Sequence, residues 1–195
     1  MSGASRRIAV VALTLIAALP AWAAVEPARY SPDAGPHKVL TVDQFILHDS
    51  ARHKDVRVKI YYPDGSGPFP VIIFSHGAFA SREAYWALGE YWASYGYVSI
   101  HPSHDDSRKD SGYRGGLMKV LNDSSLWESR PEDISFVIDS LGEIEKRVPG
   151  LEGKLDRNRI GVGGHSYGAY TAQGSAELPS PCRGRASRAA SPIRT

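Results

Sequence analysis

The residues with the clearest chemical potential form the pentapeptide Gly164-His165-Ser166-Tyr167-Gly168, which fits the G-x-S-x-G pattern of a nucleophile elbow. A serine becomes exposed for attack only on a tight turn from a strand into a helix, and the two flanking glycines let neighbouring backbone approach without a Cβ clash. The start of the helix also aims N–H groups at an oxyanion formed there. Ser166 is therefore the predicted nucleophile, and a glycine-rich turn with an incidental serine is the alternative.

The flanking sequence supplies the strand and the helix that such a turn requires. Ile160 and Val162 predict a short strand before the turn, and a run of small residues predicts a helix after it. Upstream, the apolar run Val71–Phe74 predicts a strand buried on both faces, and the turn Ser75-His76-Gly77-Ala78 follows it. Because ligands of such sheets lie beyond the carboxyl ends of the strands, both turns are expected at the same edge.

The other segments alternate between strand and helix patterns, which indicates an α/β fold with a mostly parallel sheet flanked by helices. Further strands are predicted at Val39–Leu47, Val56–Tyr62 and Tyr97–Ile100. One helix is predicted over Ser81–Tyr95, capped by Ser81 and stopped by Gly96, and a second begins at Pro131. The polar segment His101–Leu117 is long enough to suggest a functional surface loop.

Length and charge limit the possible functions. The 195 residues suit one domain with a core, and the formal net charge is +2. The arginine-rich ends hide an acidic middle: residues 24–173 carry 17 basic and 20 acidic side chains. This distribution argues against a nucleic-acid partner. Cys182 is the only cysteine, which excludes an internal disulfide or a cysteine zinc site.

The N-terminus has the three-part pattern of a secretory signal peptide. Arg6 and Arg7 precede the apolar run Ile8–Leu19, and Ala21-Trp22-Ala23 offers a small-x-small cleavage site. The predicted signal peptide covers residues 1–23, and cleavage near Ala23 implies a secreted or periplasmic protein. The run is too short for a comfortable membrane span, so no stable membrane anchor is expected. The arginine pair leaves both the Sec and the twin-arginine export routes open.

Four segments together resemble the α/β-hydrolase superfamily, most closely the branch of platelet-activating-factor acetylhydrolases, bacterial polyester hydrolases and predicted dienelactone hydrolases. These segments are Pro70–Gly77, Ser99–His104, Arg130–Leu141 and Gly161–Tyr170, in family order. The resemblance implies the N-terminal part of an α/β-hydrolase fold over residues 24–173. True dienelactone hydrolases use a cysteine nucleophile, so the serine in this chain favours the esterase side.

The resemblance also implies roles for individual residues. Ser166 would attack an ester carbonyl, and the backbone N–H groups of Ala78 and Tyr167 would form the oxyanion hole. His76 and Gly77 are expected to support their turn, as Gly164 and Gly168 support the elbow. The expected substrate is a small-molecule, lipid or polyester ester, and no cofactor or metal is expected.

The chain departs from the family pattern after the elbow. In this fold an acid and a histidine follow the nucleophile, but no histidine or aspartate follows Ser166, and Glu177 is the only later carboxylate. We therefore expect no triad acid and no triad histidine, with the family's C-terminal strands missing. Gly174–Thr195, rich in Arg, Ser, Ala and Pro, is predicted to be a disordered tail, and a frameshift or premature end is one hypothesis for it.

Three hypotheses about function follow. The first is a secreted serine ester hydrolase whose activity is impaired in this chain. The second is a non-catalytic truncated remnant or a binding module. The third makes the segment His101–Asp106 a metal site or a substitute base, against the simpler interpretation that its polar side chains are solvated in a loop.

Overall fold

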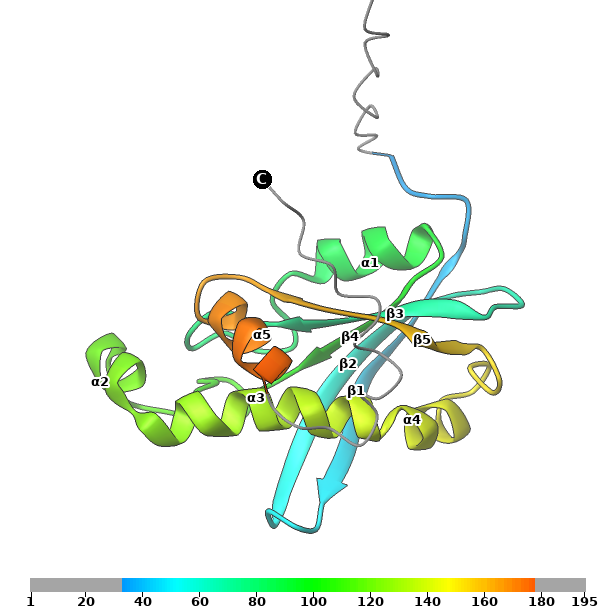
Figure 1. Cartoon of the computed structure of the whole chain (residues 1–195). Coiled ribbons are helices and arrows are strands. Elements are labelled where there is room, and N and C mark those ends of the chain that lie inside the picture. The colour runs from blue at the N-terminus through cyan, green and yellow to red at the C-terminus, as the bar shows by residue number, and fades with distance from the viewer. Residues whose placement is uncertain (1–32, 178–195) are drawn as a thin grey trace, which may run out of the picture. The chain divides into compact units, whose positions relative to one another are not determined.

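The structure, a computed structural model, describes residues 33–177, which contain five strands and five helices in the order β1-β2-β3-α1-β4-α2-α3-α4-β5-α5 (Figure 1). The strands are β1 (Val39–Asp49), β2 (Lys54–Pro63), β3 (Phe69–Ser75), β4 (Val98–Pro102) and β5 (Leu155–Gly164). The helices are α1 (Trp86–Ser94), α2 (Leu117–Asn122), α3 (Ser124–Asp139), α4 (Leu141–Arg147) and α5 (Tyr167–Glu177). All five predicted strands are present, and β5 is longer than the pattern suggested.

Within the described residues the strands form one sheet in the order β1-β2-β4-β3-β5. β2 runs antiparallel to both β1 and β4, whereas β3 runs parallel to both β4 and β5. The sheet is therefore mixed, and the prediction of a mostly parallel sheet was wrong. β1 and β2 are joined by a short turn, and a hairpin of this kind makes its strands antiparallel, whereas a parallel pair needs a crossover connection.

Helices cover both faces of the sheet. Helix α1 lies on one face, and α3, α4 and α5 lie on the other (Figure 1). Successive side chains of β2 point to opposite faces of the sheet. Val58 and Ile60 lie on the face of the main core, which also contains Ile134 of α3. Tyr61 points the opposite way, toward α1, where a Cβ on Gly89 would meet its ring at 2.4 Å. That glycine lets α1 approach the sheet closely.

The first helix begins later than predicted. Ser81 does not cap it; the Ser81 hydroxyl accepts from the amide of Glu83 within a turn, and the Arg82 amide donates to Ser103 Oγ. Tyr85, at φ 62°, has left-handed backbone, so regular helix starts only at Trp86. These tertiary contacts override the helical spacing of the apolar residues. The predicted stop is confirmed, since Gly96 has φ 89° just beyond the helix.

The second predicted helix starts earlier. α3 begins at Ser124, with Asp123 as the cap that accepts from the amide of Ser125. Pro131 lies inside the helix and not at its start. Because proline has no N–H, the carbonyl of Trp127, four residues earlier, lacks its helical hydrogen bond. Trp127 is exposed, so water can bond this carbonyl instead.

The predicted tail also begins too early, because α5 continues through Gly174 to Glu177. The predicted signal peptide, residues 1–23, and the tail from residue 178 onward lie outside the described residues. Within residues 33–177, the helices are all too short or too polar to traverse a bilayer.

Candidate active site

The pairing of β3 with β5 brings the two predicted turns side by side. Ser75, the last residue of β3, is in register with Gly164, the last residue of β5. The chain then enters the His76–Ala78 turn on one side and the elbow on the other. The His165 amide donates to the carbonyl of Ser75 at 3.2 Å. The expectation that both turns share one edge of the sheet is therefore confirmed.

The two elbow glycines lie where any side chain would collide with backbone. A Cβ on Gly164 would lie 2.3 Å from the carbonyl group of Gly168. A Cβ on Gly168 would lie 2.0 Å from the carbonyl oxygen of Ser75 and 2.7 Å from that of His76. The close approach that the G-x-S-x-G pattern predicts is thus present, and it clamps the start of α5 against the end of β3.

Ser166 occupies the tip of this turn. Its backbone has φ 54°, which a non-glycine residue adopts only under constraint from its surroundings. The residue is exposed, and no described residue forms a hydrogen bond with its hydroxyl. The geometry matches a strained, accessible serine on a strand-to-helix corner, and the nucleophilic role assigned to Ser166 stays a prediction.

The amides of Ala78 and Tyr167 flank this corner. Tyr167 is the first residue of α5, so its N–H has no acceptor within the helix. Neither amide has a hydrogen-bond partner among residues 33–177, which leaves both N–H groups available to an oxyanion. Their assignment as the two donors stays a prediction of the family resemblance.

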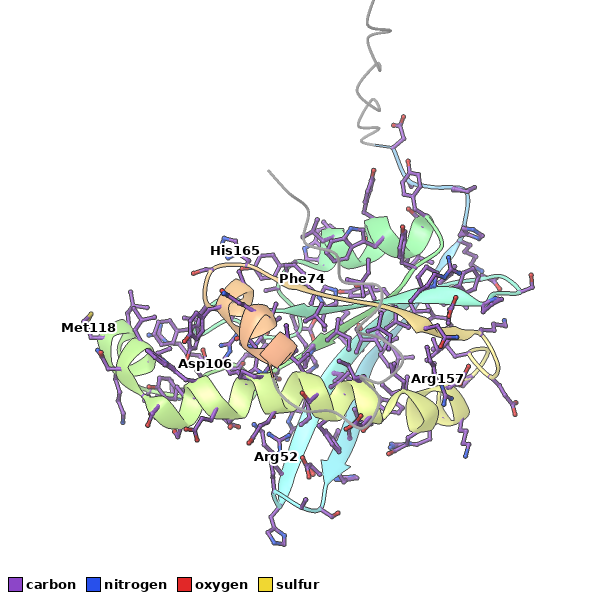
Figure 2. The ribbon with its side chains drawn as sticks, viewed as in Figure 1. Arg52, Phe74, Asp106, Met118, Arg157 and His165 are labelled. Atoms are coloured by element: carbon purple, nitrogen blue, oxygen red, sulfur yellow. The ribbon has the colours of Figure 1, made fainter. Side chains whose placement is uncertain are left out.

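His165 engages a different neighbour from Ser166. Its Nδ1 lies 2.8 Å from the hydroxyl of Tyr85, and the two rings pack with centroids 5.4 Å apart. A Cβ on Gly77 would lie 3.3 Å from the same Nδ1. Figure 2 shows His165 on the turn between β5 and α5. The side chain thus connects the elbow with the opposite turn.

His76 is buried and neutral. Its Nδ1–H donates to the carbonyl of Gly77 at 2.7 Å, and its Nε2 accepts the amide of His104 at 3.1 Å. Burial, with a smaller contribution from the nearby Arg130 charge, lowers the pKa of His76 to about 4. Both ring nitrogens are occupied by backbone groups, which is the arrangement expected of a residue that supports the turn.

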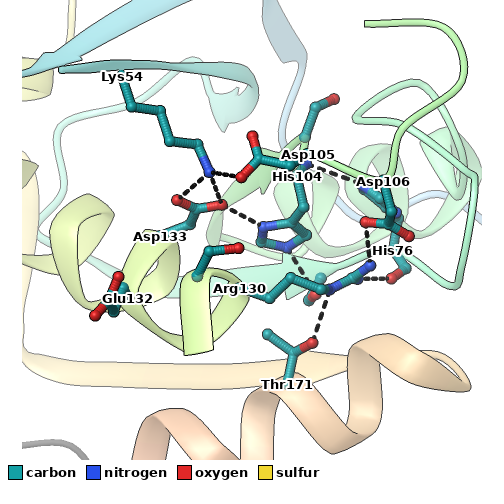
Figure 3. A network of polar contacts seen from close by, with 12 residues as sticks. Lys54, His76, His104, Asp105, Asp106, Arg130, Glu132, Asp133 and Thr171 are labelled. Carbon is teal, nitrogen blue, oxygen red and sulfur yellow. Dashed lines mark hydrogen bonds and ion pairs between the residues drawn. The ribbon is translucent and has the colours of Figure 1, made fainter. Parts of the chain in front are cut away.

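A serine, a histidine and an aspartate do form a hydrogen-bonded chain, but not at the elbow (Figure 3). Ser75 Oγ lies 2.9 Å from His104 Nε2, and His104 Nδ1 lies 2.8 Å from Asp133 Oδ2. Because a carboxylate only accepts, Nδ1 carries the proton and Nε2 accepts from Ser75. Burial lowers the pKa of His104 well below its usual range, so the contact with Asp133 is a hydrogen bond and not an ion pair. All three side chains are buried, which excludes Ser75 from contact with a substrate.

Arg130, fully buried on α3, is the centre of the same network (Figure 3). Its Nε donates to Thr171 Oγ1 on α5 at 3.0 Å, and its Nη1 donates to Asp106 at 2.7 Å. Its Nη2 donates to the hydroxyl of Ser75 at 3.2 Å and also to the carbonyl of His76. One guanidinium therefore contacts the end of β3, the loop after β4 and the helix after the elbow.

The segment His101–Asp106 is not the solvated loop that the sequence suggested. His101, His104 and Asp106 are buried, and only Asp105 is exposed, where it pairs with Lys54. No cluster of three or more His, Cys, Asp or Glu side chains arranged as metal ligands occurs in the described part of the chain. The solvated-loop interpretation was wrong, because these polar groups are buried and hydrogen-bonded inside the fold.

An open surface hollow lies elsewhere, on α3 and the β1–β2 turn. Its lining includes Arg52, Glu132 and Phe136 but no residue of the elbow. In Figure 2, Arg52 lies well apart from His165. The hollow is therefore separate from the candidate site.

The sequence did not indicate the buried residues that contact the two turns. Arg130, Asp133 and Thr171 were not singled out, although Arg130 and Asp133 interrupt the apolar face of α3 one turn apart. Charged residues within an apolar helical stripe signal a buried network, because a buried charge requires a partner. Their partners come from distant strands, and the sequence did not indicate them.

Comparisons with known proteins find similar sequences over part of the chain. Residues 59–115 match the family described as platelet-activating factor acetylhydrolase, isoform II. This match includes the His76–Ala78 turn but ends before Ser166. The acetylhydrolase of Cavia porcellus is 28% identical over 133 residues, covering 53% of this chain and 30% of that protein. The enzyme of Bos taurus is 27% identical over 136 residues, covering 53% and 31%.

One solved structure has a similar fold over part of its length. A ferulic acid esterase from Streptomyces cinnamoneus superposes with a TM-score of 0.51 and 23% identity, covering 72% of this chain and 55% of that one. This likeness shows the fold alone. The chain spans less than a third of the length of the two acetylhydrolases. The predicted resemblance is confirmed: the chain is similar to the platelet-activating factor acetylhydrolase isoform II family over residues 59–115, and its α/β fold matches that of an esterase over part of its length.

Proposed function

We propose that the protein is a serine ester hydrolase in which Ser166 is the nucleophile. The observation that carries the proposal is the backbone of Ser166, held at φ 54° and exposed on the corner between β5 and α5. Strain of this kind persists only where the surroundings enforce it, and here Gly164 and Gly168 pack against the end of β3. A serine with no catalytic task would gain stability from a relaxed turn.

The proposed chemistry is acyl transfer to Ser166. Its Oγ forms a bond to the ester carbonyl carbon, the carbonyl oxygen becomes an oxyanion, and the alcohol leaves with a proton. Water then attacks the acyl-serine and releases the acid. The N–H groups of Ala78 and Tyr167 would stabilise the oxyanion, and losing one such donor typically costs about 3–4 kcal/mol of transition-state stabilisation.

A second candidate function, a non-catalytic binding module, is favoured by one observation. No described histidine or carboxylate contacts the hydroxyl of Ser166, and residues 167–195 contain no histidine. A serine without a base is a poor nucleophile, because removing the serine or histidine of such a triad costs about a millionfold in turnover. The nucleophile and the oxyanion donors can thus be present while turnover is impaired.

A fluorophosphonate probe separates the two candidates. The ester hydrolase proposal expects covalent labelling located at Ser166 by peptide mass spectrometry and abolished by Ser166→Ala. Ser75→Ala is the matched control, because Ser75 is the serine that contacts a histidine but is buried. Labelling that persists in Ser166→Ala, or no labelling of the folded wild type, would favour the binding module.

The substrate and the location of the protein are part of the proposal. We propose an ester of a small molecule, a lipid or a polyester, as in the esterases that the chain resembles. We also propose that residues 1–23 direct export to the periplasm or the medium. Mass spectrometry of the exported protein should find a new N-terminus near Ala24, and an intact Met1 in that fraction would contradict the export proposal.

A further inference from the structure

We infer that Arg130 is a positioning residue that fixes the two halves of the oxyanion hole relative to each other. This inference rests on the proposed function of Ser166. The two amides proposed as donors lie on separate segments, the turn after β3 and the first turn of α5. Both must hold their positions within a fraction of an ångström for the hole to work. One buried guanidinium contacts both segments.

On the α5 side, Arg130 holds the helix start through Thr171 and Tyr167. The Thr171 hydroxyl accepts from Arg130 Nε at 3.0 Å and donates to the carbonyl of Tyr167 at 2.9 Å. The guanidinium carbon also lies 4.5 Å from the centroid of the Tyr167 ring. The residue whose amide serves the oxyanion is therefore held at its carbonyl and at its ring.

On the other side, Arg130 holds the turn that carries Ala78. Its Nη2 donates to the carbonyl of His76, two residues before Ala78. Its Nη1 pairs with Asp106 Oδ1, and Asp106 Oδ2 accepts the amide of Phe79 at 3.1 Å. Phe79 has φ 67°, an unfavourable backbone for a bulky residue. The Arg130–Asp106 pair supplies the constraint that keeps it there, directly after the proposed donor.

Only arginine has the geometry for this arrangement. Four of its five N–H groups are used, on acceptors from three chain segments (Figure 3). An ammonium offers three donors around one atom and cannot reach all of these acceptors together. A purely electrostatic partner for Asp106 would not need the forked contact to Thr171.

The test measures saturation kinetics of fluorophosphonate labelling at Ser166 in Arg130→Met, Arg130→Lys and Thr171→Val. In Arg130→Met the limiting labelling rate should fall about 10- to 100-fold, while the half-saturating probe concentration changes little. Arg130→Lys should recover part of the loss. Arg82→Met is the matched control, because Arg82 is a buried arginine paired with Asp110 that contacts neither oxyanion segment.

Thr171→Val carries the test if Arg130→Met does not fold. It removes the hydroxyl that links Arg130 to the carbonyl of Tyr167 and leaves the contact of Arg130 with the carbonyl of His76 in place. The limiting rate should fall about threefold or more. Ser175→Ala is its control, since Ser175 is buried on the same helix and its hydroxyl bonds, among residues 33–177, only the carbonyl of Ala172. A folded Arg130→Met or Thr171→Val protein with the wild-type limiting rate would overturn the inference.

Amide hydrogen exchange provides a readout that needs no chemistry at Ser166. If the wild type is not labelled, the proposed function fails, and exchange alone decides the positioning role. The Phe79 amide is bonded to Asp106 and the Ala169 amide to Ser166, so both report on the two segments. Exchange at both amides should accelerate together in Arg130→Met. Acceleration at only one of them, or at neither, would overturn the inference.

Discussion

Replacing Gly168 with alanine should destabilise the fold, although helix propensity alone favours alanine. Gly168 is the second residue of α5, where alanine is favoured over glycine by about 1 kcal/mol. The new Cβ, however, would lie 2.0 Å from the carbonyl oxygen of Ser75 and 2.7 Å from that of His76. Atoms of this kind do not approach within about 3 Å, so the backbones of α5 and β3 must separate by about 1 Å.

The strand cannot yield easily, because β3 is paired with β4 on one side and β5 on the other. Overpacking of this kind costs about 3 kcal/mol. The net loss is therefore about 2 kcal/mol after the propensity gain, which corresponds to about 4–8 °C in Tm. Urea unfolding, followed by tryptophan fluorescence, measures the change in free energy of unfolding.

Gly161→Ala is the matched control within the same strand-and-elbow segment. Its Cβ would meet nothing closer than the carbonyl oxygen of Val71 at 3.9 Å, and the position is exposed. Relief of glycine's excess chain entropy should leave this variant neutral or more stable by up to about 1 kcal/mol. If Gly168→Ala and Gly161→Ala unfold within about 0.5 kcal/mol of each other, the close approach of α5 to β3 is wrong.

Three further outcomes follow from the described contacts. Urea unfolding should give Ser166→Gly a free energy of unfolding about 1 kcal/mol higher than that of Ser166→Ala, because glycine adopts φ 54° without strain and alanine does not. Equal free energies would show that the backbone at residue 166 is not strained. Burial lowers the pKa of both His76 and His101 to about 4, so the unfolded chain binds protons first as pH falls below about 6.5. Stability should therefore drop by about 1.4 kcal/mol per histidine per pH unit between about pH 6 and 4.5, and urea midpoints that do not change between pH 6.5 and 5.5 would contradict this. Asp133→Asn should lower the free energy of unfolding by about 3 kcal/mol or more, because the buried Asp133 carboxylate pairs with Arg52 and Lys54. Asp105→Asn should lower it by less than about 1 kcal/mol, because Asp105 pairs with the same Lys54 but is half-exposed. Equal losses in the two variants would refute the role of burial.

The strands were predictable from the sequence because each is coded by adjacent residues. The run Val71–Phe74 is apolar throughout, and β3 is indeed covered on both faces. The direction of β2 was not predictable, since alternation of side chains is the same in parallel and antiparallel strands. The prediction that α1 starts at Ser81 was wrong for a related reason. The hydroxyl of Ser81 suits a helix cap, but contacts made elsewhere in the fold set the left-handed backbone of Tyr85, and the helix starts after it.

The candidate site also has a part that the sequence predicts and a part that it does not. The elbow is a local feature, because five consecutive residues specify both the tight corner and the close approach of Gly164 and Gly168. The supporting network is non-local: Arg130 is separated by 24 residues from Asp106 and by 41 from Thr171. Sequence periodicity predicts that a charged residue within an apolar helical face is buried, but it does not predict which distant groups compensate its charge.

Ser75, at the end of β3, and Ser166, on the turn after the neighbouring strand β5, differ in the two properties that a nucleophile needs. Ser75 has the hydrogen-bond partners of a catalytic serine, since it contacts His104, which contacts Asp133. It is nevertheless buried, and it also accepts from Arg130, which draws its lone pair away from any electrophile. Ser166 has no such partners within residues 33–177 but is exposed and strained. Nucleophilic attack requires an accessible oxygen before it requires a base, so accessibility and backbone strain support the proposal that Ser166, and not Ser75, is the nucleophile.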